Sequence, residues 1–131
     1  MMSVQFDRSQ EIPIVDAMLK GRTETSRTRL VFDTGSGLTQ IDTGLMEELG
    51  YSARDGVSTY HILGPTGEKI GGYRVKLHLL SVFGKRFENL VVGVVDFDNF
   101  SHFGISGLLG FDVIKQLHLE LDGANGIFRV F

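Results

Sequence analysis

Cysteine and tryptophan are absent from this chain of 131 residues, and only two prolines occur. Without cysteine, disulfide bonds and thiolate metal sites are excluded, and the redox compartment stays open. No apolar run approaches the roughly 20 residues that cross a bilayer, and the N-terminus lacks a signal-peptide profile. The formal net charge is only -3, from interspersed acidic and basic residues. We therefore expect no membrane or nucleic-acid partner, and a cytoplasmic protein if the chain is complete; for a piece of a longer protein the compartment is undetermined.

The length predicts a single domain spanning residues 1–131, large enough to bury a core. No linker, low-complexity segment or internal repeat is visible. Alternating apolar residues and Gly-rich turns indicate a mainly β domain with two short helices. A polar turn is expected at 21–28, a loop at 96–103, and a strand at 87–95 that is buried on both faces. The remaining extended segments are expected at 4–6, 12–19, up to 32, 38–41, 57–63, 70–80, 105–110, 117–122 and 127–131.

Residues 33–37, with the sequence DTGSG, directly follow the apolar run 30–32. A carboxylate at the end of a buried strand is costly to place, because little bulk water reaches it. Thr34 can fix the loop through its hydroxyl, and Gly35 permits a tight backbone path. The ordinary interpretation is a capped turn. The pattern equally fits a loop that holds the Asp33 side chain in a fixed position.

The tripeptide Asp-Thr-Gly occurs a second time, at residues 42–44. Here a helical pattern follows, with Leu45, Met46 and Leu49 on one face and Gly50 as a stop. Asp42 or Thr43 is therefore expected to cap this short helix. No helical pattern follows Asp33, so that only the first copy remains a catalytic candidate.

Residues 105–110, with the sequence ISGLLG, place two large apolar residues between glycines. Such a strand predicts a backbone that passes very close to another element. Asp112 is expected to cap a second helix, whose Val113, Ile114 and Leu117 face inward. The segments 30–39 and 107–110, in this order, resemble the retropepsin-like aspartic proteases, above all the small single-domain members of bacteria and archaea. The resemblance covers about residues 12–122.

The resemblance implies a closed β-barrel, the acid protease half, with a flap hairpin. It implies Asp33 as the catalytic residue, in an active-site loop that comprises Thr34, Gly35 and Ser36. It also implies that Gly107, Leu108, Leu109 and Gly110 support this loop. Gly37 is a departure, because the family usually carries a polar side chain there, and one polar contact near the active site is missing.

A β-hairpin is expected from two alternating runs that flank a Gly- and Pro-containing tip. Its ordinary role is a surface turn. In the family, the hairpin in this place of the chain is a flap that closes over substrate. The residues expected to cover the substrate are Ile62, Leu63, Gly64, Pro65 and Thr66.

Aspartic protease chemistry uses two aspartates that share one proton, and this chain supplies one. The resemblance therefore implies a homodimer in which Asp33 of each chain meets across a two-fold axis. We expect an aspartic endopeptidase that hydrolyses peptide or protein substrates with an activated water, and no cofactor or metal. The apolar strand 127–131 is expected at or near the subunit contact.

Other chemistries fit less well. Neither Ser36 nor Ser106 lies in a G-x-S-x-G elbow, and Gly35 and Gly37 lack the third glycine of a dinucleotide site. His61, His78, His102 and His118 lack the spacing of metal ligands. The main alternative is a catalytically silent domain of the same fold, a dimerising peptide-binding or scaffold module.

Overall fold

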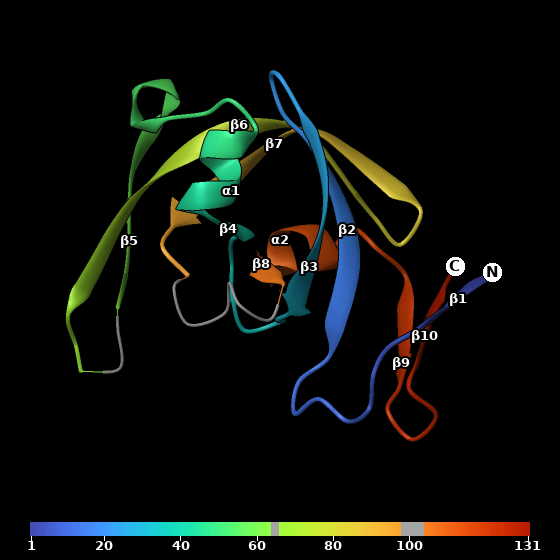
Figure 1. Cartoon of the computed structure of the whole chain (residues 1–131). Helices are drawn as coiled ribbons and strands as arrows, with labels where there is room; N and C mark the ends of the chain where they lie inside the picture. Colours follow the sequence, from blue (N-terminus) through green and yellow to red (C-terminus); the bar gives the residue numbers. More distant parts are fainter. Residues whose placement is uncertain (64–65, 98–103) are drawn as a thin grey trace.

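The computed structural model describes residues 1–63, 66–97 and 104–131 (Figure 1). The strands are β1 (Met2–Gln5), β2 (Ile14–Lys20), β3 (Thr25–Phe32), β4 (Gln40–Asp42), β5 (Ser58–Leu63), β6 (Lys69–Val82), β7 (Lys85–Val95), β8 (Ile105–Leu109), β9 (Leu119–Asp122) and β10 (Ile127–Val130). The helices are α1 (Thr43–Glu48), α2 (Phe111–Ile114) and the 3-10 turn η1 (Ala53–Asp55). The mainly β class and the two short α-helices are thus confirmed.

The larger sheet closes on itself. Its strands follow the order β2-β3-β8-β4-β7-β6-β5, and β2 also pairs with β6. In the described part of the chain, six strands therefore form a closed barrel, and β5 extends from it as the outer strand of a hairpin with β6. The predicted closed β-barrel and the hairpin are both present, with the hairpin projecting from the barrel in Figure 1.

The barrel core follows from alternation along the strands. In β6, Val75, Leu77 and Leu79 are buried, while Lys76 and His78 between them are exposed. This period of two is the pattern that the sequence shows over the same segment. Helix α1 adds Leu45 and Met46 to the same core.

A second sheet, in the order β1-β10-β9, joins both ends of the chain. Its Phe128 is fully buried and packs at 4.8 Å between ring centroids against Phe32, the last residue of β3. Phe6 and Phe83 complete the aromatic cluster, each 5.1 Å from Phe128. The apolar terminal strand therefore finds its partner surface within its own chain, and this cluster supports the strand that leads into Asp33.

Three local expectations were wrong. The predicted turn 21–28 is shorter, since β3 already begins at Thr25 and pairs with Lys20. Strand β7 is buried only in its C-terminal half, because that half lies between β4 and β6, whereas its first half pairs with β6 alone. Asp112 does not cap α2; Gly110 occupies the N-cap position. Most of the expected loop 96–103 lies outside the described residues.

Candidate active site

Asp33 follows the last residue of β3 and is half-buried. Its backbone N–H donates to the carbonyl oxygen of Leu109 at 3.0 Å, which continues the β3–β8 pairing into the loop. Its carboxylate Oδ1 accepts the backbone N–H of Gly35 at 2.8 Å. The strand thus fixes the Asp33 backbone, and the loop's own amide orients the side chain.

Ser36 ties the rest of the loop in place. Its hydroxyl donates to the carbonyl oxygen of Leu38 at 2.8 Å, and its own carbonyl oxygen accepts the Phe111 N–H at 2.7 Å. The loop is therefore bonded to itself and to the start of α2. Gly37 is exposed, and a Cβ there would meet no atom within 4 Å.

Strand β8 and the glycine after it pass very close to the chain that follows the loop, as the glycines predicted. A Cβ on Gly107 would lie 2.0 Å from the carbonyl oxygen of Gln40, and one on Gly110 would lie 2.6 Å from the carbonyl carbon of Leu38. Leu109 is fully buried, and Leu108 pairs with Val31. The close backbone approach that the sequence predicted is confirmed.

A pair of hydrogen bonds from one buried side chain joins the segment 33–40 to the start of α2. The fully buried Thr39 hydroxyl donates to Asp112 Oδ1 at 2.8 Å and accepts the Gly110 N–H at 3.0 Å. This explains the failed capping prediction, because the Asp112 carboxylate turns back toward Thr39 while Gly110 begins the helix. One hydroxyl therefore positions both Gly110 and the first turn of α2.

A second link joins this segment to the base of the predicted flap. The buried Gln40 donates from Nε2 to the Tyr60 hydroxyl at 2.8 Å, and the same nitrogen lies 3.4 Å from the Ser36 hydroxyl. The Tyr60 ring lies over Gly93, where a Cβ would come within 2.7 Å, and the Arg74 guanidinium is 4.9 Å from the ring centroid. Burial is the largest cause that raises the pKa of Tyr60, and the Arg74 charge opposes it.

Sequence reasoning did not assign these supporting roles to Gln40, Tyr60 or Asp112. The signal in the sequence was the pair of polar residues Thr39 and Gln40, which lie inside the segment 38–41 that is expected to be extended. A buried polar side chain needs a hydrogen-bond partner, but the sequence does not name that partner.

The second Asp-Thr-Gly copy is a helix cap, as predicted. Asp42 Oδ2 accepts the Gly44 N–H at 3.0 Å, and Asp42 Oδ1 accepts the Phe97 N–H at 2.8 Å. Both carboxylate oxygens are occupied by backbone donors. Gly50 has a φ of +94°, the conformation expected just after a helix end.

The predicted flap residues lie at the end of the β5–β6 hairpin. Ile62 is half-buried and Leu63 is 74% exposed. Thr66 is exposed and bonds to the Glu68 carboxylate through both its N–H and its hydroxyl. Gly64 and Pro65 fall outside the described residues. The role of residues 62–66 as a substrate cover stays a prediction.

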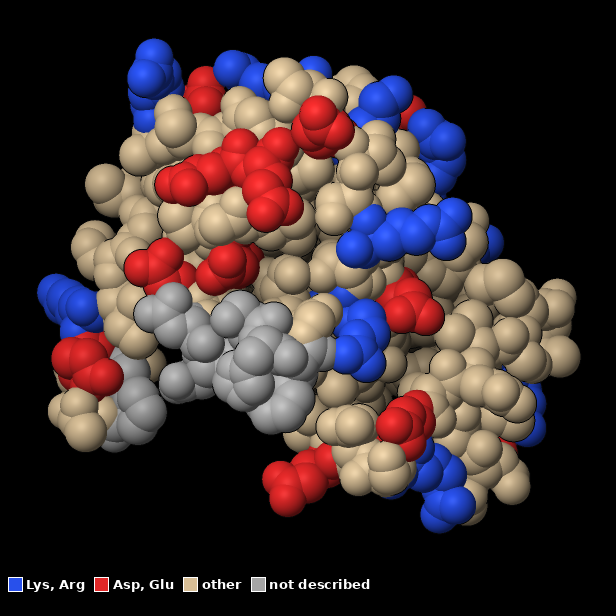
Figure 2. All heavy atoms as spheres, viewed as in Figure 1, with Lys and Arg blue, Asp and Glu red and all other residues tan. Residues whose placement is uncertain are grey.

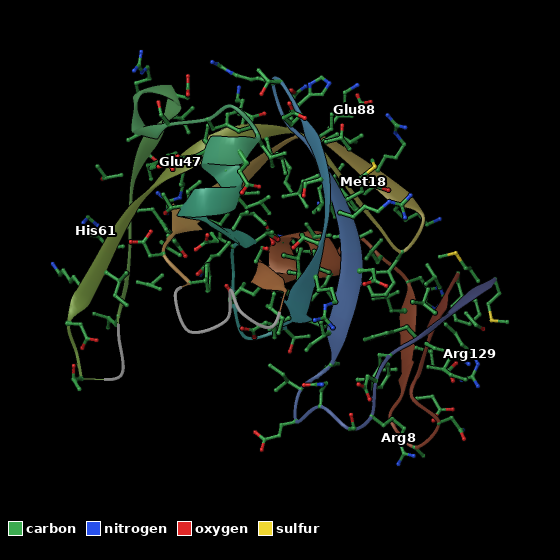
Figure 3. The ribbon with its side chains drawn as sticks, viewed as in Figure 1. Arg8, Met18, Glu47, His61, Glu88 and Arg129 are labelled. Carbon is green, nitrogen blue, oxygen red and sulfur yellow. The ribbon has the colours of Figure 1, made fainter. Side chains whose placement is uncertain are left out.

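No other described feature competes with this site. Within residues 1–63, 66–97 and 104–131, no group of three or more His, Cys, Asp or Glu side chains could hold a metal ion. Figure 3 places His61 on β5, on the opposite side of the molecule from Arg129, and His102 is not described.

No helix in the described part of the chain is long and apolar enough to span a membrane. The face in Figure 2 carries both acidic and basic side chains, without a continuous basic area.

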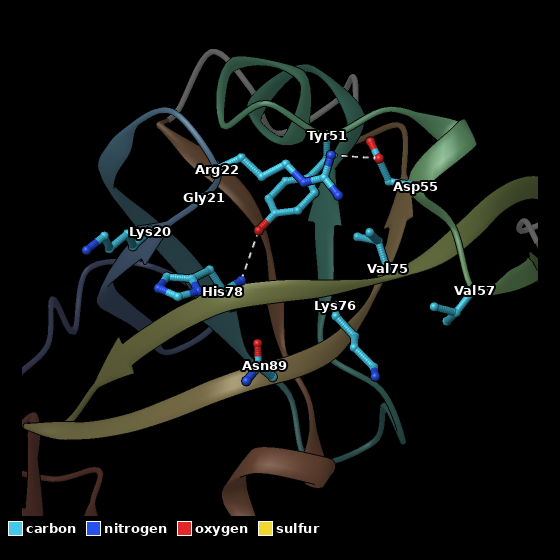
Figure 4. A pocket seen from close by; sticks show the side chains of 10 residues that line it. All are labelled: Lys20, Gly21, Arg22, Tyr51, Asp55, Val57, Val75, Lys76, His78 and Asn89. Atoms are coloured by element: carbon cyan, nitrogen blue, oxygen red, sulfur yellow. Dashed lines mark hydrogen bonds and ion pairs between the residues drawn. The ribbon is translucent and has the colours of Figure 1, made fainter.

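A hollow of about 480 Å³ is lined by residues of β2, η1, β6 and β7 and their connections, and by no residue of the DTGSG loop (Figure 4). Its Lys20 and Lys76 side chains point in different directions, and Arg22 is paired with Asp55 at 2.9 Å. The Tyr51 hydroxyl accepts the His78 N–H at 2.9 Å. The basic side chains of this hollow do not converge on one ligand.

Comparison with known proteins identifies the class. The aspartyl protease family model matches residues 15–113, and the chain belongs to this family. The retropepsin-like aspartic protease from Rickettsia conorii has a TM-score of 0.66 at 16% identity, covering 98% of this chain and 88% of that chain. EIAV protease, complexed with the inhibitor HBY-793, has a TM-score of 0.57 at 17% identity, covering 82% of this chain and 88% of that chain. The retroviral protease-like domain of Ddi1 from Leishmania major has a TM-score of 0.58 at 12% identity, covering 91% of this chain and 87% of that chain.

No curated protein matches the sequence significantly. The structural similarities show the fold, and they confirm the predicted retropepsin-like barrel. The DTGSG loop and its β8 support lie within the matched residues 15–113.

Proposed function

We propose that this protein is an aspartic endopeptidase that acts as a homodimer, with Asp33 of each chain forming one shared catalytic pair. The observation that carries the proposal is the fixed geometry of Asp33. Its N–H is bonded to Leu109 at 3.0 Å, and its Oδ1 accepts the Gly35 N–H at 2.8 Å. A carboxylate that is held but half-exposed suits a group that must face water and a second carboxylate.

The chain brings one such aspartate, so the second must come from another copy. Thr34 and Gly35, which follow Asp33, are both exposed. In the described part of the chain, no hydrogen-bond partner of the Thr34 hydroxyl is found. In the proposed dimer, Thr34 of each chain bonds to the loop of the other and holds the two loops together. Two-fold symmetry then places both Asp33 side chains at the axis.

The chemistry requires one ionised and one protonated carboxyl. The ionised Asp33 takes a proton from a water molecule as its oxygen attacks the scissile carbonyl carbon. The protonated Asp33 donates its proton to the carbonyl oxygen, which gives a neutral gem-diol. Collapse of the gem-diol breaks the C–N bond, returns one proton to the carboxylates and delivers one to the leaving amine. The products are a carboxylic acid and an amine, and no redox partner is needed.

Activity in this mechanism has a bell-shaped pH dependence. Two carboxylates a few ångströms apart do not both ionise easily, so one proton is shared over a range of pH. The doubly ionised pair lacks the acid, and the doubly protonated pair lacks the base. The rate therefore falls on both sides of an optimum.

The direct test is Asp33→Asn, assayed on a diverse peptide library with and without a transition-state-mimicking aspartic protease inhibitor. The amide keeps the shape of the side chain but can neither act as a base nor share the proton. We expect hydrolysis to disappear while circular dichroism and dimerisation are retained. Activity comparable to the wild type would contradict the assignment.

A catalytically silent, dimerising peptide-binding domain is the second candidate. The observation in its favour is Gly37, where the family's usual polar side chain is missing and a Cβ would find open space. Wild-type protein that binds peptides without cleaving them, across a range of pH, would favour this candidate.

A further inference from the structure

We propose that Tyr60 and Arg74 bind an acidic side chain of the substrate, and that the enzyme therefore selects peptides with Asp or Glu at a fixed distance from the cut bond. This inference rests on the proposed function, because it names the substrate class of the same site. Tyr60 lies on β5 and Arg74 on β6, at the base of the hairpin that we expect to cover substrate.

Two hydrogen bonds place Tyr60 beside the DTGSG loop. The buried Gln40 amide donates to the Tyr60 hydroxyl at 2.8 Å, and the same nitrogen lies 3.4 Å from the hydroxyl of Ser36, which belongs to the loop. The ring of Tyr60 is held against β7, where a Cβ on Gly93 would come within 2.7 Å of it. A peptide that lies between this loop and the hairpin therefore passes the Tyr60 side chain.

The Tyr60 hydroxyl has a proton left to donate. Its oxygen accepts the hydrogen bond from Gln40, so the O–H group needs an acceptor of its own. Among the residues that the structure describes, no such acceptor is found. Tyr60 is half-buried, so that part of its side chain stays open to a ligand. A ligand that fits this position offers an acceptor oxygen.

Arg74 brings a positive charge to the same place. Its Nη1 donates to the Thr59 carbonyl oxygen at 3.0 Å and to the Ser58 hydroxyl at 3.2 Å. The guanidinium lies 4.9 Å from the centroid of the Tyr60 ring. Within the described part of the chain, no carboxylate pairs with Arg74, and its Nε and Nη2 make no hydrogen bond. A half-buried guanidinium with two donor groups to spare suits a carboxylate.

The charges that act on Tyr60 also favour an anion. Burial is the largest cause that raises the pKa of Tyr60, and Arg74 has the largest effect of any charge on it. The Asp112 carboxylate has the opposite and smaller effect, and its Oδ1 is bonded to Thr39. The surroundings of the Tyr60 hydroxyl are therefore positive on balance, which favours a carboxylate over an ammonium group.

Cleavage of a diverse peptide library by the wild-type protein tests the preference. Each chain of the proposed homodimer brings one Tyr60 and one Arg74, so Asp and Glu should be enriched at matching distances on both sides of the cut bond. Two peptides that differ only in Glu or Gln at that position then measure the selectivity. We expect kcat/KM to be about tenfold or more higher for the Glu peptide at low salt, and the ratio to fall as salt is added. A ratio close to one at low salt would overturn the proposal.

Variants of the two residues show whether they cause the selectivity. Arg74→Gln should bring the ratio of the two kcat/KM values to about one, and Arg74→Glu should reverse the preference toward Lys at the same position. Tyr60→Phe should lower the ratio as well as both rates. Lys76→Gln removes the same charge two residues further along β6 and should keep the wild-type ratio. The ratio does not depend on the fraction of folded enzyme, so an unchanged ratio in Arg74→Gln would contradict the assignment.

Binding measurements separate this inference from the proposed function. Asp33→Asn protein, used to select peptides from the same library without cleavage, should bind the Glu peptide more tightly than the Gln peptide. Arg74→Gln in the same background should remove the difference. If this holds while the wild type hydrolyses nothing, acidic recognition stands and the proposed function fails. If hydrolysis requires Asp33 but shows no acidic preference, the proposed function stands and this inference fails.

Discussion

Gln40 and Tyr60 join the DTGSG loop to the base of the β5–β6 hairpin, through a hydrogen bond of 2.8 Å from the Gln40 amide to the Tyr60 hydroxyl. The same amide nitrogen lies 3.4 Å from the Ser36 hydroxyl. The hairpin that we expect to cover substrate is therefore connected to the loop that holds Asp33. Removal of the Tyr60 hydroxyl should disturb both.

Tyr60→Phe should lower kcat/KM several-fold while the protein remains folded. The loss leaves the buried Gln40 amide without this acceptor, which costs about 1–3 kcal/mol in the free energy of unfolding. Steady-state kinetics and urea denaturation measure the two effects. Tyr73→Phe is the matched control, because the Tyr73 hydroxyl is buried and has no hydrogen-bond partner in the described part of the chain. Equal losses in both variants would mean that the Gln40–Tyr60 bond has no special role.

Thr39→Val should be among the most destabilising conservative substitutions in the site. The Thr39 hydroxyl serves both Asp112 and the Gly110 N–H, and valine has nearly the same shape. Each partner that is left buried without a hydrogen bond costs about 1–3 kcal/mol. Thermal unfolding checks the loss, and Thr59→Val on the exposed side of β5 provides the comparison. A Thr39→Val protein as stable as the wild type would show that these hydrogen bonds contribute little.

Asp42→Ala separates the two copies of the tripeptide. Asp42 caps α1 and accepts two backbone N–H groups, so its loss should cost about 0.5–2 kcal/mol in the free energy of unfolding. Hydrolysis should persist at temperatures where the variant is folded. A stable Asp42→Ala protein without activity would show that the catalytic role belongs to Asp42.

Asp122 gives a prediction about pH. The hydrogen bond from the Asn125 side chain is the largest cause that lowers the pKa of Asp122, and Arg129 adds to it. A lowered folded-state pKa stabilises the protein above the unfolded-state pKa, and this contribution is lost as pH falls through the folded value. Asp122→Asn should therefore unfold at a lower temperature than the wild type near neutral pH, with the difference shrinking toward pH 2. A difference that is constant with pH would contradict this origin.

Much of the fold could be predicted because alternation decides which face of a strand is buried. Val75, Leu77 and Leu79 point inward along β6 as their spacing requires. The glycines of β8 predicted a close backbone approach to another element, and Gly107 makes such an approach, to Gln40. The capping role of Asp42 could also be predicted, because a helix cap forms between residues that are close in the sequence.

The failures concern long-range partners. Asp112 resembled a cap in the sequence, but Thr39, distant in the chain, is the group that its carboxylate contacts. Strand β7 was expected to be buried throughout, but alternation cannot show that its first half pairs with β6 alone. The sequence showed that the apolar end of the chain needs a surface, and it did not show that Phe32 of the same chain provides one.

The central claim, that two chains share one pair of Asp33 side chains, is tested most directly by mixing wild-type protein with the Asp33→Asn variant. Each mixed dimer has a single Asp33, so at equal amounts and free exchange the activity per wild-type chain should fall to about half, and further as the variant is added in excess. Sedimentation of the same samples confirms that dimers persist. Activity per wild-type chain that stays constant across the titration, in samples shown to contain mixed dimers, would contradict the shared site.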